Sequence, residues 1–379
     1  MGDEHDAIER LLRTAGIGHA RVRALRAHFG GASAAIEAEP AAFAAAIGVR
    51  TDEGARMLAE ARRMPLAEDR AFLDRIGARR LLEGEGGYPA LLGVMPDPPP
   101  MLFVRGRLES EPEAAVAIVG SRRASAYGRL QAGRIAGDLA ARGVTVVSGG
   151  ARGIDAEAHR AAMRAGGRTV AVLATGLSHP YPDEHAPLFD AIVEGGGAIL
   201  TEQCLDVTAR PDLFPRRNRL IAGLALVTVV VEAASRSGAL LTARLAVDDL
   251  SRTAGCVPGP VDSVTSEGCH RAIREGWAQL VTCADDVCEL IEEMRSLAHG
   301  AAAAAAPGCA KDAPMRVEVG GDAAEVLRVI RESGRAGLDE LERTLEWTVP
   351  RIALATLELE RAGLAARDSE GAFRRTAAG

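Results

Sequence analysis

A short helix-like stretch, residues 213–223 with the sequence LFPRRNRLIAG, carries charges where an apolar helix would start. Its polar side chains are Arg216, Arg217, Asn218 and Arg219. Charges in such a place cost free energy unless something pairs with them. The candidate partners inside the chain are Glu202, Asp206 and Glu232. The other candidates are the phosphates of a ligand. We expect a split, with one or two arginines paired internally and the rest facing a ligand.

Three turns rich in small residues carry the other candidates for phosphate binding. They are GSRR at 120–123, SGGARGID at 148–155 and EAASRSGAL at 232–240. Each turn follows an apolar run and precedes a helix-like stretch, so it presents backbone N–H groups beside a helix N-terminus, where anions bind favourably. Their candidate residues are Gly120, Ser121, Arg122, Gly149, Gly150, Arg152, Ser237 and Gly238. With the arginine cluster, these turns predict a ligand that bears phosphate.

Other side chains near these turns permit two interpretations. Phe214 could stack on one base, or it could be an ordinary core residue. Asp155 and His159, one helical turn apart, could form a base oriented by a carboxylate. We favour the alternative, an acidic residue that stabilises a helix N-terminus with a histidine nearby. Neither GxGxxG nor GxxxxGK[ST] is present, so neither motif for nucleotide binding supports an assignment.

Alternating strands and helices would position these residues. The strand-like runs, apolar and rich in β-branched residues, are 115–120, 144–149, 169–176, 198–202 and 224–233. Amphipathic helical stretches separate them, which predicts an α/β fold with an extended Rossmann-like, doubly wound, mostly parallel sheet. Ligands of such sheets bind outside the carboxyl ends of the strands. The Gly- and Ser-containing turns follow those ends.

Two breaks divide the chain. The proline-rich segment 96–101 follows a helical N-terminal third, and the low-complexity segment 299–314 reads as a linker. The domains predicted from these breaks and from the patterns between them are an N-terminal helical module at 1–80, a Rossmann-like domain at 81–295, a flexible linker at 296–320 and a winged-helix domain at 321–379.

The two flanking domains have weaker functional signals. AGIGHARVRALRAHFGG at 15–31 predicts a helix–hairpin–helix or SAM-like module, for which packing and DNA contact are both open. The C-terminal segment predicts three helices and two short strands, the pattern of a winged helix. Its recognition helix, 348–362, balances Arg351 and Arg361 against two glutamates, which argues against strong duplex binding. We prefer a protein contact or a weak accessory role for this domain.

Composition limits the function classes. The net charge of −7 excludes a bulk binder of polyanions, so any nucleic-acid site is a local basic patch. Six scattered cysteines without a CxxC pair favour buried free thiols in a reducing compartment over a metal site built from Cys269, His270, Cys283 and Cys288. The charged N-terminus does not read as a signal peptide, and no apolar run approaches about 18 residues, so we expect a cytoplasmic protein without a membrane span.

Seven segments taken in order resemble the DNA-processing protein A family (DprA, also called Smf), over about residues 90–295. They are VAIVGSRRASAYG, VSGGARGIDAEAH, VAVLATGLSHPYP, LTEQC, FPRRNRLIAGL, VVVEAASRSGALLTARLA and VPGPVDSVTSEGCHRAI. The chain departs from many members at His185 and His270, where asparagine is common, at Ser251, where glycine is common, and at Pro211, where a basic residue is common and Arg210 could substitute.

This resemblance implies a function. Family members bind single-stranded DNA on the Rossmann-like domain, form dimers, help to load the RecA recombinase during natural transformation, and have no established catalytic activity. No cofactor is implied. The family's DNA pocket corresponds here to Arg122, Gly149, Gly150, Phe214, Arg217, Asn218 and Arg219, bordered by Ser237 and Gly238.

Two other function classes stay open. The same type of fold resembles hydrolases that release a base from a nucleoside monophosphate, in which Glu232 could be the general base. Their PGGxGTxxE motif is absent, and EAASRSGAL stands in its place. A pure interaction scaffold would follow if no nucleic acid binds.

Overall fold

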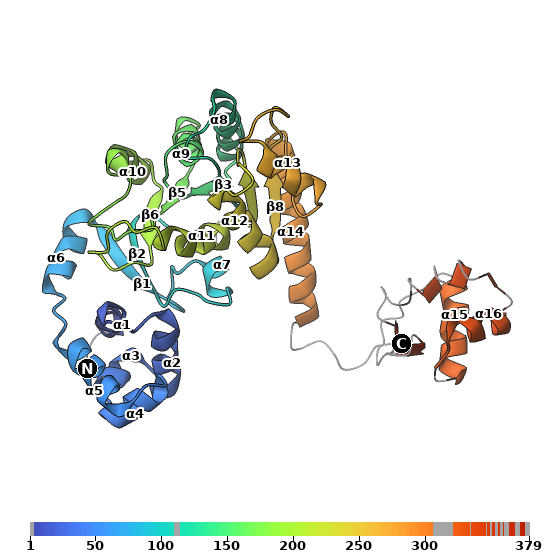
Figure 1. Ribbon diagram of the computed structural model, residues 1–379, viewed down its shortest axis with the longest axis horizontal. Coiled ribbons are helices and arrows are strands. Elements are labelled where there is room, and N and C mark those ends of the chain that lie inside the picture. Colours follow the sequence, from blue (N-terminus) through green and yellow to red (C-terminus); the bar gives the residue numbers. More distant parts are fainter. Residues whose placement is uncertain are drawn as a thin grey trace. The chain divides into compact units, whose positions relative to one another are not determined.

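The computed structural model describes residues 4–109, 114–305 and, with gaps, 321–375. The chain forms two compact units, Met1–Ala304 and Ala305–Gly379. The first unit holds one sheet of nine strands and the helices around it (Figure 1). Its strands are β1 (Ala78–Leu82), β2 (Met101–Gly106), β3 (Ala115–Val119), β4 (Thr145–Ser148), β5 (Thr169–Val172), β6 (Ala198–Thr201), β7 (Val227–Val230), β8 (Thr253–Cys256) and β9 (Gln279–Leu280).

The strand order is β1-β2-β6-β5-β4-β3-β7-β8-β9. In this order, all neighbouring strands between β6 and β9 pair in parallel, which includes β5, β4, β3, β7 and β8. Strand β2 is antiparallel to both β1 and β6. From β3 the chain builds outward through β4, β5 and β6, then crosses over to place β7 on the other side of β3. The sheet is therefore doubly wound, and its topological switch point lies between β3 and β7, as the α/β prediction requires.

Helices cover both faces of this sheet because its central strands are apolar on both sides. The helices after β1 are α7 (Ala90–Gly93), α8 (Ala126–Ala141), α9 (Ile154–Arg164), α10 (Ala186–Glu194), α11 (Leu213–Gly223), α12 (Gly238–Arg244), α13 (Glu267–Arg274) and α14 (Ala284–Ala305). Short 3₁₀ and π-helical segments lie at Asp183–His185 and Leu245–Asp249. One core includes Ile135 of α8 and Ala158 of α9, and the core on the opposite face includes Ile221 of α11 and Leu240 of α12 (Figure 1).

Six helices precede the sheet: α1 (Glu4–Arg13), α2 (His19–Phe29), α3 (Ala32–Glu37), α4 (Pro40–Ala46), α5 (Thr51–Arg63) and α6 (Ala67–Ile76). Ile8 and Leu11 of α1 belong to the same core as Phe103 of β2 and Leu173 beyond β5. The helical module therefore shares a core with the sheet, and the boundary predicted at residue 80 falls inside β1. Among the described helices, none combines the length and apolar content of a membrane span.

The second unit contains α15 (Gly321–Ser333), α16 (Leu338–Leu345) and an antiparallel hairpin of β10 (Ala365–Arg367) and β11 (Phe373–Arg375). Its own apolar core includes Val326, Leu341 and Phe373. Much of the predicted recognition helix, 348–362, lies outside the described residues, so the winged helix stays a prediction. Because α14 continues to Ala305, the first part of the segment predicted as a linker from residue 296 is helical.

Candidate functional site

A cleft of about 770 Å³ lies at the carboxyl ends of the strands, beside the β3/β7 switch point. We call it the switch-point cleft. It brings together seven of the residues predicted from the sequence: Gly120, Arg122, Phe214, Arg217, Asn218, Ser237 and Gly238. They come from the turn after β3, from α11 and from the N-terminus of α12. This is the edge at which doubly wound sheets bind ligands.

The glycines beside the cleft permit close packing of its loops. A Cβ on Gly149 would lie 2.7 Å from Nη2 of Arg217 and 2.8 Å from Oδ2 of Asp155. Gly153 has φ of +78°, and a Cβ there would lie 2.2 Å from the carbonyl oxygen of Ser121. Gly150 is likewise buried, and Nδ1 of the buried His185 donates to its carbonyl oxygen at 2.8 Å. The loops after β3 and β4 can meet only because Gly153 lacks a side chain.

Arg217 is buried beneath the cleft and fixes the loop after β4. Its Nη1 donates to the carbonyl oxygen of Gly149 at 2.7 Å and also to that of Val172. Burial lowers the pKa of Arg217 to about 10, and the nearby Asp155 carboxylate opposes this shift. Asp155 in turn accepts hydrogen bonds from the amides of Gly149 and Ala151, while burial raises its pKa. Arg217, predicted as a ligand contact, therefore acts first as an organiser of the cleft floor.

Arg122 and Phe214 form the wall of the cleft. The Arg122 side chain is exposed, and its guanidinium carbon lies 4.7 Å from the centroid of the Phe214 ring. Phe214 is half-buried, so part of its side chain faces solvent. Within the described part of the chain, no carboxylate forms an ion pair with Arg122. A cation over a half-buried ring can contact a phosphate while the ring contacts a base.

Beyond this wall the structure adds Tyr181, which the sequence interpretation did not single out. The Tyr181 ring lies edge-to-face with Phe214, with centroids 5.7 Å apart. The guanidinium carbon of Arg152 is 5.9 Å from the Tyr181 centroid, and Arg152 also pairs with Glu184. The sequence did contain one indication of this residue. Tyr181 is one of only 3 tyrosines in the chain, and it stands in a turn after a predicted strand.

The two remaining arginines of the cluster face away from the switch-point cleft. Arg219 pairs with the buried Glu202 and donates to the carbonyl oxygen of Asp97 at 2.6 Å. The ion pair with Glu202 was one of the internal pairs considered from the sequence. Arg216 is exposed and lines, with Arg219 and His19, a separate recess between α11 and the turn before α2. The cluster therefore divides between two faces of α11.

Burial and nearby charges shift the pKa values of Glu202 and His19, which line this recess. Burial raises the pKa of Glu202 to about 7, although Arg219 opposes the shift. Burial and the positive charge of Arg219 lower the pKa of His19 to about 4, so this side chain is neutral at pH 7. Three arginines and three carboxylates line the recess, whereas two arginines and one carboxylate line the switch-point cleft, so the recess is less favourable for phosphate.

The two predicted serines shape their turns. Oγ of Ser121 accepts from the amide of Arg123 at 3.1 Å, and Oγ of Ser237 accepts from the amide of Ala239 at 3.2 Å as the N-cap of α12. Gly238 next to it is exposed. These hydrogen bonds fix the local backbone geometry of the two turns.

The possible catalytic residues are engaged elsewhere. His159 is fully buried, and its Nδ1 lies 2.7 Å from Oγ1 of Thr169, not beside Asp155. The two carboxylate oxygens of the buried Glu232 accept hydrogen bonds from the amide of Ser125 and from the hydroxyl of Thr265. Glu232 does not line the switch-point cleft, so nothing in the geometry equips it as a general base for a ligand bound there.

Of the five cysteines that the structure describes, three are the buried free thiols that the sequence predicted. Cys204, Cys256 and Cys269 are buried, Cys283 and Cys288 are half-buried, and none of these five forms a disulfide. Across the residues that the structure describes, no group of histidines, cysteines and carboxylates could hold a metal ion.

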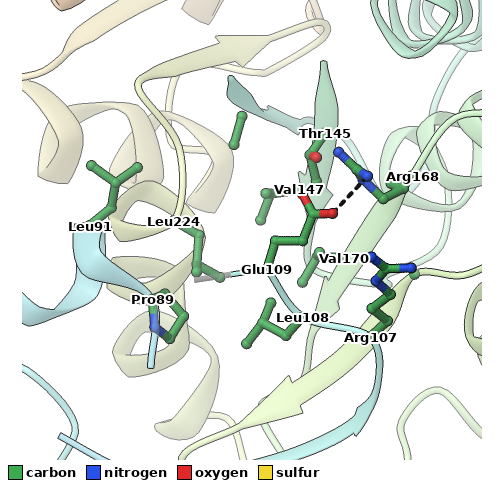
Figure 2. Close-up of a pocket in the computed structure, with 12 residues that line it drawn as sticks. Pro89, Leu91, Arg107, Leu108, Glu109, Thr145, Val147, Arg168, Val170 and Leu224 are labelled. Carbon is green, nitrogen blue, oxygen red and sulfur yellow. Dashed lines mark ion pairs between the residues drawn. The ribbon is translucent and has the colours of Figure 1, made fainter. Parts of the chain in front are cut away.

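A further pocket lies at the opposite, amino-terminal edge of the strands (Figure 2). Apolar side chains such as Leu108, Val147 and Leu224 line it, and Glu109 pairs with Arg168 at 2.7 Å at its mouth. None of the residues predicted from the sequence to bind phosphate or DNA lines this pocket.

A family model and curated relatives of this chain point to the same family. A family model described as DNA recombination-mediator protein A matches residues 79–292. A putative DNA processing protein DprA of Mycobacterium tuberculosis is 39% identical over 328 residues, which is 83% of this chain and 81% of that protein. Protein Smf of Escherichia coli is 44% identical over 205 residues, 54% of each chain.

Two solved structures are also similar. The X-ray structure of DprA from Streptococcus pneumoniae has a TM-score of 0.66 and 31% identity, and covers 76% of this chain and 98% of its own. A DprA structure from Helicobacter pylori, described in terms of its single-stranded DNA binding mode, has a TM-score of 0.50 and 27% identity, and covers 59% of this chain and 96% of its own. With the family model and the M. tuberculosis relative, these similarities establish that the chain belongs to the DNA recombination-mediator protein A family, also called DprA or Smf.

Proposed function

We propose that this chain binds single-stranded DNA along the switch-point cleft. The observation that carries the proposal is the pair of Arg122 and Phe214, an exposed guanidinium over a half-buried ring at the ligand edge of the sheet. The H. pylori relative, for which a mode of single-stranded DNA binding is described, supports the choice of ligand. Single strands suit such a site because their bases are free to stack on side chains.

The electrostatics of the cleft suit a backbone contact without sequence readout. The chain as a whole carries −7, so attraction must come from local groups such as Arg122 and the turn amides. Few side chains in the cleft could read the edges of bases, and Asn218 is the main amide among them. We therefore expect affinity that depends on salt and only weakly on sequence.

We further infer, from family membership, that the protein acts in the cytoplasm as a homodimer that protects incoming single strands and helps to load RecA during natural transformation. This proposal would be tested by measuring RecA-driven strand exchange on DNA covered by single-strand-binding protein. Stimulation by the wild-type chain is the expected result. A chain that binds single strands yet leaves the exchange rate unchanged would contradict the loading role alone.

The binding proposal is tested by fluorescence anisotropy with a labelled oligo-dT of a few tens of nucleotides at several salt concentrations. The wild type should bind, with unlabelled duplex competing poorly. Arg122→Ala should weaken binding and make the salt slope shallower by about 0.7 for the lost phosphate contact. The control is Arg160→Ala, which removes an exposed arginine of α9 outside the cleft. If the wild type fails to bind at low salt, or if both variants weaken binding equally, the proposal is wrong.

A further inference from the structure

A second, smaller pocket adjoins the switch-point cleft on the far side of its wall. The two share Arg122, Ala151, Phe214 and Arg217, and the second pocket adds Gly149, Arg152, Tyr181 and Pro182. The groove at the carboxyl edge therefore has two compartments, separated by the Arg122–Phe214 pair.

Two adjacent aromatic rings, flanked by two arginines, line these two compartments. The order is Arg122, Phe214, Tyr181 and Arg152. The guanidinium carbon of Arg122 lies 4.7 Å from the Phe214 centroid, and that of Arg152 lies 5.9 Å from the Tyr181 centroid. The two ring centroids are 5.7 Å apart. Both rings are half-buried, so part of each surface faces solvent. Rings flanked by cations can hold bases while the guanidinium groups neutralise the adjoining phosphates.

The angle between the rings indicates how many bases they would hold. Their planes meet at 67°, so one base cannot lie flat on both rings. The centroid separation of 5.7 Å also exceeds the rise of about 3.4 Å per nucleotide along a duplex strand. Two successive bases that are unstacked from each other match this arrangement, one against each ring.

We infer that Tyr181 is a second base-stacking residue, holding the nucleotide next to the one that Phe214 holds. This inference rests on the proposed binding of single-stranded DNA and extends it to a defined pair of adjacent nucleotides. Arg152 lies beside the second nucleotide, where it exchanges its contact with Glu184 for a phosphate.

Two measurements on the full chain test the inference. In anisotropy titrations with oligo-dT, Tyr181→Ala should lower the affinity about fivefold or more, whereas Tyr181→Phe, which keeps the ring, should bind like the wild type. Tyr127→Ala is the matched control, because Tyr127 is exposed on α8 and lines neither compartment.

The second measurement separates stacking from a structural role of Tyr181 in supporting Phe214. Oligo-dT carrying a single 5-iodouracil is photo-crosslinked to the wild-type chain, and the adducts are located by mass spectrometry. Adducts on both Tyr181 and Phe214 are expected. If Tyr181→Ala binds normally, or if adducts form on Phe214 but not on Tyr181, the inference is overturned while DNA binding stands. Failure of the wild type to bind any oligonucleotide would overturn the proposed function as well.

Discussion

At the scale of single residues, neighbouring arginines of one cluster have different roles, and the residue types alone could not assign them. Arg217 is buried with two backbone carbonyls as acceptors, Arg219 pairs with Glu202, and Arg216 is exposed. The sequence predicted that the cluster would be divided, because unpaired charges beside an apolar helix are costly. Which arginine turns inward depends on the rotation of α11 against the sheet, and this is a property of packing.

The position of Arg217 predicts a large effect on stability. In Arg217→Ala, the carbonyls of Gly149 and Val172 lose their donor and Asp155 loses a nearby positive charge. We expect the free energy of unfolding to fall by about 3 kcal/mol or more. The neighbouring Arg216→Ala, at an exposed site, should change it by less than about 0.5 kcal/mol. Urea denaturation of the two variants measures both values, and similar losses would show that Arg217 does not organise the loop.

A second prediction at this scale concerns Glu184, which pairs with Arg152 at the surface. Glu184→Gln should raise the affinity for single-stranded DNA about two- to fivefold at low salt, because it frees Arg152 and removes a negative charge near the phosphates. The gain should shrink as salt increases. Glu157→Gln is the control, since Glu157 pairs with Arg164 and lines neither compartment. An unchanged or lower affinity of Glu184→Gln would mean that Arg152 makes no phosphate contact.

At the scale of elements, the sequence predicts the central strands well and the edges poorly. β3 to β7 each fall within a run that was predicted as a strand, because buried parallel strands are continuous apolar segments. β1, β2, β8 and β9 were not predicted as strands. β1 begins where a helical region was expected to end, and β2 follows the proline-rich segment and pairs with β6 about a hundred residues away. Long-range antiparallel pairing of this kind leaves no local periodicity to detect.

The contact between α9 and β5 predicts a pH dependence of stability. Oγ1 of Thr169 donates to the carbonyl oxygen of Val146, so it accepts from Nδ1 of His159, which leaves Nε2 buried without a partner. Burial lowers the pKa of His159 to about 3. The unfolded chain therefore binds a proton near pH 6.5 that the folded chain does not bind, and the stability present above this pH is lost as the pH falls towards 3.

His159→Asn keeps a donor for Thr169 and removes the titrating ring. We expect the free energy of unfolding of this variant to fall less steeply between pH 6 and pH 4, by at most about 1.4 kcal/mol per pH unit relative to the wild type. Urea titrations at a series of pH values measure the slopes. His179→Asn, at an exposed histidine, is the control and should keep the wild-type slope. Equal slopes for all three proteins would show that His159 binds its proton in the folded state.

At the scale of the whole molecule, every residue of the switch-point cleft lies in the unit Met1–Ala304, which has its own cores. A chain ending at Ala304 should therefore keep the thermal transition of this unit. It should also bind oligo-dT with an affinity of the same order and with the same salt slope, which calorimetry and anisotropy measure. A clearly weaker affinity with a shallower slope would place phosphate contacts in the C-terminal unit, because the slope reports the number of phosphates neutralised. The near-neutral charge of segment 348–362 makes us expect the first result, with the C-terminal unit free to contact a protein.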